Sequence, residues 1–241
     1  MISKNKIKYI RGLSLKKNRI KEKCFIVEGE KSLYELLDSS FEVVELFALK
    51  EWINENKDVF EKVQAVSLRE LEMISNLKSP NKVLALVKIR EQKIIFKQTE
   101  VILVLDDIND PGNLGTIIRM CDWFGVKQIV CSENTVDIYN PKVVQATMGS
   151  LFRVNVLYIN LVKYLRTVNT LIYGAYMNGE NIRNSNLDRD SHLVMGNEAN
   201  GISTEVSEFI TDKIAINNIG GKAESLNVAV ATSILLHEFC N

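Results

Sequence analysis

Long apolar segments are absent from this sequence of 241 residues. No run approaches the ~20 consecutive apolar residues that a membrane-spanning helix needs. The N-terminal stretch, residues 1–23, is basic and has no apolar core of the length found in signal peptides. We therefore expect a protein that works in the cytoplasm and has no membrane partner.

Cysteine and histidine are too scattered to suggest a metal centre. The four cysteines include no C-x-x-C pair, and no histidine lies close enough in the sequence to complete a zinc set. Buried free thiols are the better interpretation, and we expect no metal. His192 and His237 lie far apart in the sequence, so each is expected to be an ordinary structural or surface residue.

The net charge of zero is the sum of two unlike halves. Residues 1–98 hold 20 Lys and Arg against 14 Asp and Glu, whereas residues 99–241 hold 10 against 16. Nine of the basic residues fall within the first 23, where Glu22 is the single acid. Lysine and arginine bind nucleic acids by releasing counterions from phosphates, so the front half is a candidate for meeting a polyanion. A solvated basic face is the plain alternative.

The apolar pattern predicts two α/β domains, residues 1–97 and 98–241. The first is expected to have helices at 3–21, 30–37 and 67–75 and strands at 24–29, 43–49, 63–66 and 83–87. The second opens with a continuous apolar run at 101–107, which is typical of a strand buried in a parallel sheet. Its further strands are expected at 127–132, 152–159, 170–177, 192–196 and from 213, with helices at 116–124, 140–148, 161–168, 204–209 and from 228. Strands and helices in alternation predict a parallel sheet covered on both faces.

Three strand ends in the second domain carry glycine and polar residues together. They are residues 110–119 (DPGNLGTIIR), 196–203 (GNEANGIS) and 220–227 (GGKAESLN). Ligands of open parallel sheets bind beyond the carboxyl ends of the strands, so these loops are expected to form one pocket. Any one of them alone would fit an ordinary strand–loop–helix unit; the three together favour a site.

Two other interpretations of these residues are weaker. Gly112 and Gly115 lack the third glycine of the G-x-G-x-x-G fingerprint, which disfavours a nucleotide-binding oxidoreductase. Asp106 and Asp107 could form a general-base or metal pair, but carboxylates that close a buried strand are more often turn and cap residues.

The three loops resemble, in order, the motifs of the SpoU (TrmH-like) branch of the SPOUT superfamily of RNA ribose 2′-O-methyltransferases. Asn113 followed six residues later by Arg119 matches the first motif, LVMGNEANGIS (residues 193–203) the second, and IAINNIGGKAESLNVAVA (residues 214–231) the third. ATMGSLFRVNV (residues 146–156) also resembles a family segment, and FIVEGEKSLYELL (residues 25–37) resembles the L30e-like domain that often precedes the catalytic one. Ala215 stands where the family usually has proline, and the loop that follows is longer than in many relatives.

The resemblance implies a fold and a cofactor. The expected fold is an α/β protein with a C-terminal parallel-sheet SPOUT domain, a deep trefoil knot and a small L30e-like α/β domain in front. The expected cofactor is S-adenosylmethionine, and a homodimer is implied. By carry-over, the cofactor-binding residues are Gly196, Asn197, Ile214, Ile216 and Leu226, and the catalytic residues are Asn113, Arg119, Glu198, Ser225 and Asn227.

The family assigns removal of the 2′-hydroxyl proton to the motif-one arginine, here Arg119. Because a guanidinium stays protonated, Arg119 is equally a candidate for orienting a neighbouring phosphate that takes the proton. Glu198 is as well suited to a structural cap as to a direct role.

The expected activity is therefore methylation of a ribose 2′-hydroxyl in structured RNA, ribosomal RNA first and transfer RNA as the alternative. A non-catalytic RNA-binding or assembly factor with the same fold is the remaining possibility.

Overall fold

The computed structural model describes residues 1–57, 63–92 and 100–240, and the chain forms two compact units. One unit is Met1–Glu91 with Asp137–Phe152, and the other is Gln92–Val136 with Arg153–Asn241. The predicted boundary between residues 97 and 98 lies outside the described residues. In the part of the chain that is described, no helix has the length and apolar character needed to cross a membrane.

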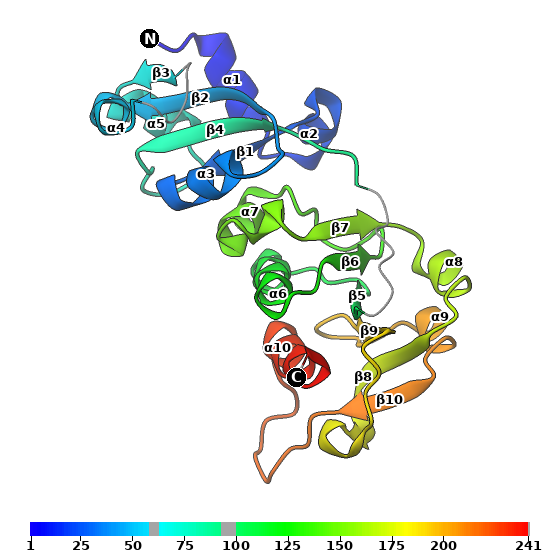
Figure 1. The fold of residues 1–241 in the computed structure, drawn as a ribbon. Coiled ribbons are helices and arrows are strands. Elements are labelled where there is room, and N and C mark those ends of the chain that lie inside the picture. Colours follow the sequence, from blue (N-terminus) through cyan, green and yellow to red (C-terminus); the bar gives the residue numbers. More distant parts are fainter. Residues whose placement is uncertain (58–62, 93–99, 241) are drawn as a thin grey trace. The chain divides into compact units, whose positions relative to one another are not determined.

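The first unit is built on a four-stranded sheet of order β1-β4-β2-β3 (Figure 1). β4 runs antiparallel to both its neighbours, and β2 and β3 are parallel. The strands are β1 (Cys24–Glu28), β2 (Val43–Leu49), β3 (Val63–Val66) and β4 (Val83–Lys88). The helices α3 (Glu30–Leu37), α4 (Lys50–Glu55) and α5 (Leu68–Ile74) alternate with them. Each strand lies within one residue of its predicted bounds.

The single helix predicted for residues 3–21 is wrong, because two helices are present. α1 spans Lys4–Gly12 and α2 spans Lys16–Glu22. Arg19 explains the break: it turns inward, is 2% exposed, and its Nη1 donates 2.8 Å hydrogen bonds to the carbonyls of Leu13 and Ser14 at the elbow. A buried guanidinium thus satisfies backbone acceptors that a continuous helix would have used internally.

The Asp137–Phe152 segment packs with the first unit, although the sequence-based division assigns it to the second domain. It contains α7 (Pro141–Thr147) and the short 3-10 helix η1 (Ser150–Phe152). Its aromatic rings lie against β1 and the loop after α3: the Phe25 and Tyr139 centroids are 4.5 Å apart, and those of Phe41 and Phe152 are 5.2 Å apart.

The second unit contains a six-stranded sheet of order β10-β8-β9-β5-β6-β7 in which every neighbouring pair is parallel. Its strands are β5 (Ile102–Leu105), β6 (Gln128–Cys131), β7 (Asn155–Tyr158), β8 (Leu171–Asn181), β9 (Ser191–Met195) and β10 (Asp212–Ala215). The predicted α/β class with a parallel sheet is therefore confirmed. Apolar residues on both faces of β5 and of residues 193–195 of β9 account for these buried positions, while the buried Ser191 and His192 at the start of β9 are hydrogen-bonded.

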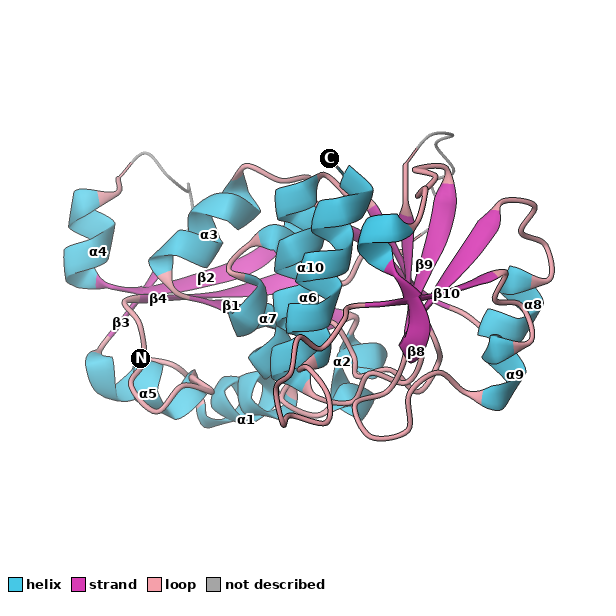
Figure 2. Ribbon diagram, turned by 90° about the horizontal axis from the view of Figure 1, so that it is seen from below, coloured by secondary structure: helices cyan, strands magenta, loops and turns pink. Residues whose placement is uncertain are grey.

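Helices cover both faces of this sheet (Figures 1 and 2). α6 (Pro111–Phe124) and the C-terminal α10 (Val228–Cys240) pack together on one face. α8 (Leu161–Leu165) and α9 (Thr204–Ser207) lie on the other, over a core that includes Val104 and Val194. The 3-10 helix η2 (Ile182–Asn184) follows β8 directly.

The loop predicted for the start of motif one is also wrong, because α6 begins there at Pro111. The Asp110 side chain accepts from the backbone N–H of Asn113 at 2.8 Å, as a helix N-cap does, and proline at the first helical position needs no partner for an N–H. Turn-forming residues here build the first turn of a helix.

Candidate active site

Three loops leave the carboxyl ends of adjacent or near strands of the second unit. The loop after β5 leads into α6, that after β9 spans residues 196–203, and that after β10 spans residues 216–227. The first two are joined at their bases, since the N–H of Asp106 donates to the carbonyl of Met195 at 2.9 Å. This is the edge at which parallel α/β sheets bind ligands.

Side chains from all three motifs meet in one hydrogen-bond network. Asn113 Nδ2 donates to Glu198 Oε1 at 2.9 Å, and Asn227 Nδ2 donates to Asn113 Oδ1 at 2.9 Å. The Glu198 carboxylate also accepts from the backbone N–H groups of Asn109 and Asp110, at 3.4 and 3.3 Å. Residues 85 and 114 positions apart in the sequence are thus held together, and Asn113 is the central member.

Glu198 is an anion in this arrangement. Partial burial alone would raise its pKa, but the hydrogen bonds from Asn113 and from the N–H groups of Asn109 and Asp110 outweigh burial and lower it. All its donors favour the charged form. A carboxylate stabilised in this way is a poor proton acceptor, which favours a positioning role for Glu198 over general-base catalysis.

The loop after β9 requires glycine at its entrance. A Cβ on Gly196 would lie 2.1 Å from the carbonyl carbon of Gly201 and 2.2 Å from the nitrogen of Ile202. Asn197 and Gly201 exchange two backbone hydrogen bonds of 2.9 Å, which closes the loop on itself. Asn197 Nδ2 also donates to the carbonyl of Asp107 at 2.7 Å, and this fixes the loop to the strand end beside it.

Asp106 and Asp107 are structural, as the sequence favours. The buried Asp106 carboxylate accepts from Ser203 N at 2.8 Å and from Ser203 Oγ at 2.7 Å. Asp107 adopts φ 60° and donates its N–H to Ser132 Oγ at 2.9 Å. Both residues therefore shape the loops that surround the site.

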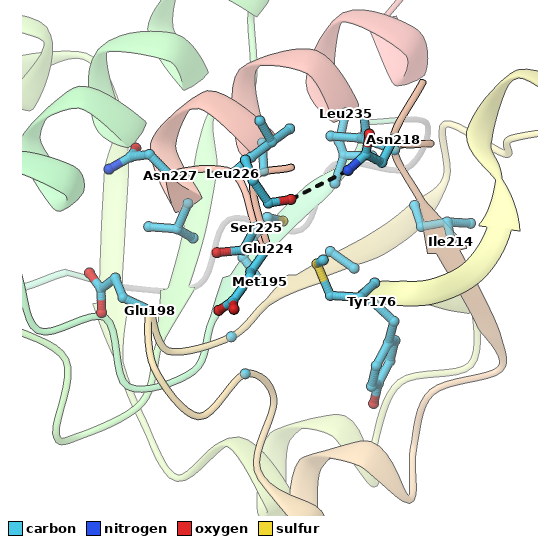
Figure 3. Close-up of a pocket in the computed structure, with 18 of the residues that line it drawn as sticks. Tyr176, Met195, Glu198, Ile214, Asn218, Glu224, Ser225, Leu226, Asn227 and Leu235 are labelled. Carbon is cyan, nitrogen blue, oxygen red and sulfur yellow. Dashed lines mark hydrogen bonds between the residues drawn. The ribbon is translucent and has the colours of Figure 1, made fainter. Parts of the chain in front are cut away.

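A cavity of about 830 Å³ lies between the second and third loops (Figure 3). This volume falls within the ~300–1,000 Å³ range of small-molecule sites. All five residues expected to bind the cofactor line it, and so do Glu198, Ser225 and Asn227. In Figure 3, Glu198 and Asn227 lie at one side of the cavity and Ile214 at the other, while the Tyr176 ring points away.

The lining suits a cationic cofactor. Its side chains are apolar or neutral amides and hydroxyls, with Glu198 and Glu224 as carboxylates and no Lys, Arg or His among the described lining residues. Two carboxylates without a counter-cation favour a bound positive charge, such as the sulfonium of S-adenosylmethionine. Gly196, Ile214, Ile216 and Leu226 would hold its uncharged part, and backbone groups of the loops supply donors and acceptors.

The third loop is the most exposed part of the lining. Every residue from 217 to 227 is exposed, and Ile219 is 91% exposed. Asn218 organises the tip: its Oδ1 accepts from Gly221 N at 2.7 Å, and its Nδ2 donates to the carbonyls of Gly221 and Ala223. Gly220, at φ 89°, allows this tight turn.

Arg119 lies apart from the cavity lining. It is exposed on α6, and within the described residues it makes no hydrogen bond or ion pair. Its guanidinium is therefore available to an external anion. The sequence predicts both Asn113 and Arg119 as catalytic residues, and of these two only Asn113 joins the network described above.

Several lining residues were not predicted from the sequence. Tyr176 belongs to no motif that the sequence makes recognisable, and Met195 and Asn218 lie within the second and third motifs but were not among the predicted site residues. Ala231 and Leu235 of α10 also line the cavity. The helical spacing of apolar residues in α10 indicates a buried face without indicating that part of it borders a ligand site.

Histidine and cysteine are structural, as expected. The buried His192 ring contacts the Tyr164 hydroxyl through Nε2 at 2.8 Å and the Thr170 hydroxyl through Nδ1 at 3.1 Å, at the amino end of β9 and not at the carboxyl end from which the second loop leaves. All four cysteines are unpaired, and three of them are buried. Within residues 1–57, 63–92 and 100–240, no group of three or more His, Cys, Asp and Glu is arranged to hold a metal ion.

Both parts of the chain match known proteins in sequence. A model of the SpoU rRNA Methylase family matches residues 100–237, and a model of the MRM3-like substrate binding domain matches residues 4–85. The chain is 32% identical over 238 residues to the 23S rRNA (guanosine(2553)-2′-O)-methyltransferase RlmP of Bacillus subtilis strain 168. That match covers 96% of this chain and 94% of the relative.

Solved structures agree in fold over nearly the whole length. A protein from Porphyromonas gingivalis assigned to the TrmH family of RNA methyltransferases superposes with a TM-score of 0.90 at 34% identity, covering 99% of this chain and 98% of that one. An AdoMet-bound rRNA methyltransferase from Sinorhizobium meliloti superposes with a TM-score of 0.87 at 28% identity, covering 99% and 96%. The chain belongs to the SpoU rRNA methylase family.

Proposed function

We propose that this protein transfers a methyl group from S-adenosylmethionine to a ribose 2′-hydroxyl in ribosomal RNA. The observation that carries the proposal is the Asn113–Glu198–Asn227 network, which holds the entrance of α6 beside a cavity lined by carboxylates and neutral groups. The relative from Bacillus subtilis is a 23S rRNA 2′-O-methyltransferase, which supports ribosomal RNA as the substrate class.

When bound, S-adenosylmethionine supplies an activated methyl group, so the protein's task is placement. Ile214, Ile216 and Leu226 form an apolar wall for the uncharged part of the cofactor. Asn113 and Asn227 fix the start of α6 against the start of α10, and the methyl-accepting oxygen must be held in line with the reacting carbon at this junction.

Arg119 serves to orient the RNA backbone. A guanidinium remains protonated at any physiological pH, and it binds a phosphate through two parallel N–H donors. Arg119 is exposed and has no partner in the described structure, so it can bind the phosphate next to the acceptor ribose. In this arrangement the 2′-hydroxyl proton passes to a phosphate oxygen, with Arg119 stabilising the charge.

We further propose a deep trefoil knot, a homodimer, an L30e-like first unit and a cytoplasmic location. Packing of α10, the last helix, on α6, the first helix of the second unit, supports threading of the tail. Trp123 on α6 and Val230 on α10 are 82% and 49% exposed, and large apolar side chains of this kind support a dimer contact at these helices. The cytoplasmic location follows from the proposed substrate.

The test is methyl transfer from labelled S-adenosylmethionine to purified ribosomal and transfer RNA. Arg119→Ala is expected to reduce transfer more than about 100-fold and to leave cofactor affinity within about twofold. Arg166→Ala removes another exposed arginine, on the far face of the sheet at the end of α8, and is the matched control. Loss of cofactor binding together with transfer would show that Arg119 is structural.

The same experiment separates the alternatives. If only transfer RNA becomes labelled, the substrate is transfer RNA and not ribosomal RNA. Cofactor binding without transfer to any RNA would favour a non-catalytic RNA-binding or assembly factor.

A further inference from the structure

A second cavity lies in the first unit, in the groove between α1 and α2. Its volume is about 350 Å³, and the proposed mechanism uses none of its residues. It is lined by Asn5, Lys8, Tyr9, Gly12, Asn18 and Glu22. We call this set the α1–α2 groove.

The groove presents free hydrogen-bonding groups. Asn18 Nδ2 donates to the carbonyl of Gly12 at 2.7 Å, which leaves Asn18 Oδ1 without a partner in the part of the chain that the structure describes. The Asn5 side chain has no partner among those residues either. Glu22 also lines the groove; its Oε1 is paired with Lys21 at 3.5 Å, and its Oε2 has no partner among the described residues. Side-chain amides and carboxylates are the groups with which proteins read the edges of nucleobases.

Tyr9 adds an aromatic surface to the groove. Lys6 Nζ lies 5.3 Å from the centroid of its ring, and the ring packs against the core of the first unit. Burial raises the pKa of Tyr9 to about 12, so its hydroxyl remains neutral at physiological pH. Aromatic rings beside cations are common platforms for unpaired bases.

Free cations lie on α1 and α2 and at the C-cap of α2. Of the nine basic residues among the first 23, Lys6, Arg19 and Lys21 are paired with carboxylates. The other six are exposed and have no carboxylate partner among the described residues: Lys4, Lys8, Arg11, Lys16, Lys17 and Lys23. Lys8 both lines the groove and belongs to this group, so phosphate binding and base recognition would occur side by side.

We propose that the α1–α2 groove binds one unpaired nucleotide of the RNA substrate, with its base read by Asn5, Asn18 and Glu22 and its phosphate bound by Lys8 and Arg11. The volume admits a single nucleotide and excludes a duplex. Glu22 accepts hydrogen bonds, so the preferred base carries an exocyclic amino group, as adenine, cytosine and guanine do; uracil has only its N3–H as a donor, between two carbonyl oxygens that repel a carboxylate. This inference rests on the proposed function for its RNA substrate.

The test is binding of fluorescein-labelled oligoadenylate, oligocytidylate and oligouridylate to the full-length protein, followed by fluorescence anisotropy at several salt concentrations. We expect oligouridylate to bind about fivefold or more weakly than the other two, and Glu22→Gln with Asn5→Ala to reduce that preference to near unity. Lys8→Ala with Arg11→Ala should weaken all three by about tenfold and lower the salt slope by about 1.4.

Lys31→Ala with Lys78→Ala removes two exposed lysines elsewhere in the same unit and should leave the base preference unchanged. Equal binding of the three oligonucleotides by the unaltered protein would overturn the inference, as would a preference that survives Glu22→Gln with Asn5→Ala. Tight binding to phosphatidylserine vesicles with no oligonucleotide preference would assign the basic surface to a membrane instead. Methyl transfer and cofactor affinity are measured in parallel, so failure of the groove and failure of the proposed activity are distinguishable.

Discussion

Asn113 is the residue on which the candidate active site converges. Its amide nitrogen donates to Glu198 while its amide oxygen accepts from Asn227, so both ends of one side chain are used. Only an amide of this length supplies a donor and an acceptor in this geometry.

Asn113→Asp tests that requirement without changing the size of the side chain. A carboxylate at this position would face the Glu198 carboxylate across a contact of 2.9 Å, and repulsion would separate the two loops. We expect kcat/KM for methyl transfer to fall about 100-fold, since small displacements at a reacting centre cost this much. Asn200→Asp places the same charge in the exposed loop beside it and should change kcat/KM less than threefold.

His192 gives the second unit a dependence on pH. Burial lowers its pKa to about 4 from about 6.5, so the unfolded chain binds more protons between these values. The stability that a neutral His192 contributes is complete above pH 6.5, declines as the pH falls, and is lost below pH 4. The difference corresponds to about 3 kcal/mol. Chemical denaturation at several pH values from 7.5 to 4 measures this difference, and the dependence of unfolding free energy on pH should be weaker in His192→Gln.

At the residue scale, the sequence predicts which residues belong to the site better than it predicts the hydrogen bonds between them. Asn113, Glu198 and Asn227 are recognisable from their motifs, but their mutual hydrogen bonds depend on how three strand ends meet. Asn218 could not be predicted, because its function is to bond the backbone of its own loop, and many asparagines in turns do the same without bordering a site.

Among the elements, α6 matters most, because its first turn carries Asn113 and its exposed face carries Arg119. The Asp110 cap fixes where this helix begins. The start of α6 could not be predicted from the sequence, because Asp, Pro, Gly and Asn favour loops and also favour the N-terminus of a helix.

Asp110→Ala should shift the start of α6 and displace Asn113. An exposed N-cap contributes about 1 kcal/mol, so we expect a small loss of stability with a larger loss of methyl transfer, about tenfold. Asp110→Asn preserves an acceptor and should retain most of both. Thermal unfolding and kcat/KM measured on these two variants distinguish a capping role from a requirement for negative charge.

The strands were predictable because their apolar runs are short, continuous and bounded by turn residues. The basic N-terminal helix was not, since its break depends on Arg19 folding inward to bond two carbonyls. Arginine at that spacing is usually a solvent-exposed residue, so no local pattern distinguishes it.

On the scale of the whole molecule, the main feature that the sequence did not predict is that residues 137–152 return to the first unit after residues 92–136 have formed part of the second. The apolar pattern of residues 137–152 fits either unit, and only the packing of Tyr139 and Phe152 against aromatic rings of the first unit decides between them. The ion pair of Arg19 with Asp137 fastens this segment, with Nε and Nη2 of the guanidinium 3.0 and 2.5 Å from the same carboxylate oxygen.

Breaking this pair from either side should be costly. Arg19 and Asp137 side chains are 3% and 15% exposed, so removing one partner leaves a buried charge, and we expect each alanine variant to lose about 3 kcal/mol of unfolding free energy. The double variant should lose clearly less than the sum, which urea denaturation of all four proteins would reveal. Additive losses would mean that the two residues act independently.

The interleaved segment also sets an order of events on the ribosome. Residues 1–91 are made before Asp137–Phe152, so the first unit must wait for about 60 further residues, or roughly 3–12 s of synthesis. During that interval Phe25 and Phe41 have no aromatic neighbour from the late segment. A nascent chain stalled near residue 130 is therefore expected to expose this apolar surface to chaperones, and one stalled well past residue 152 is not.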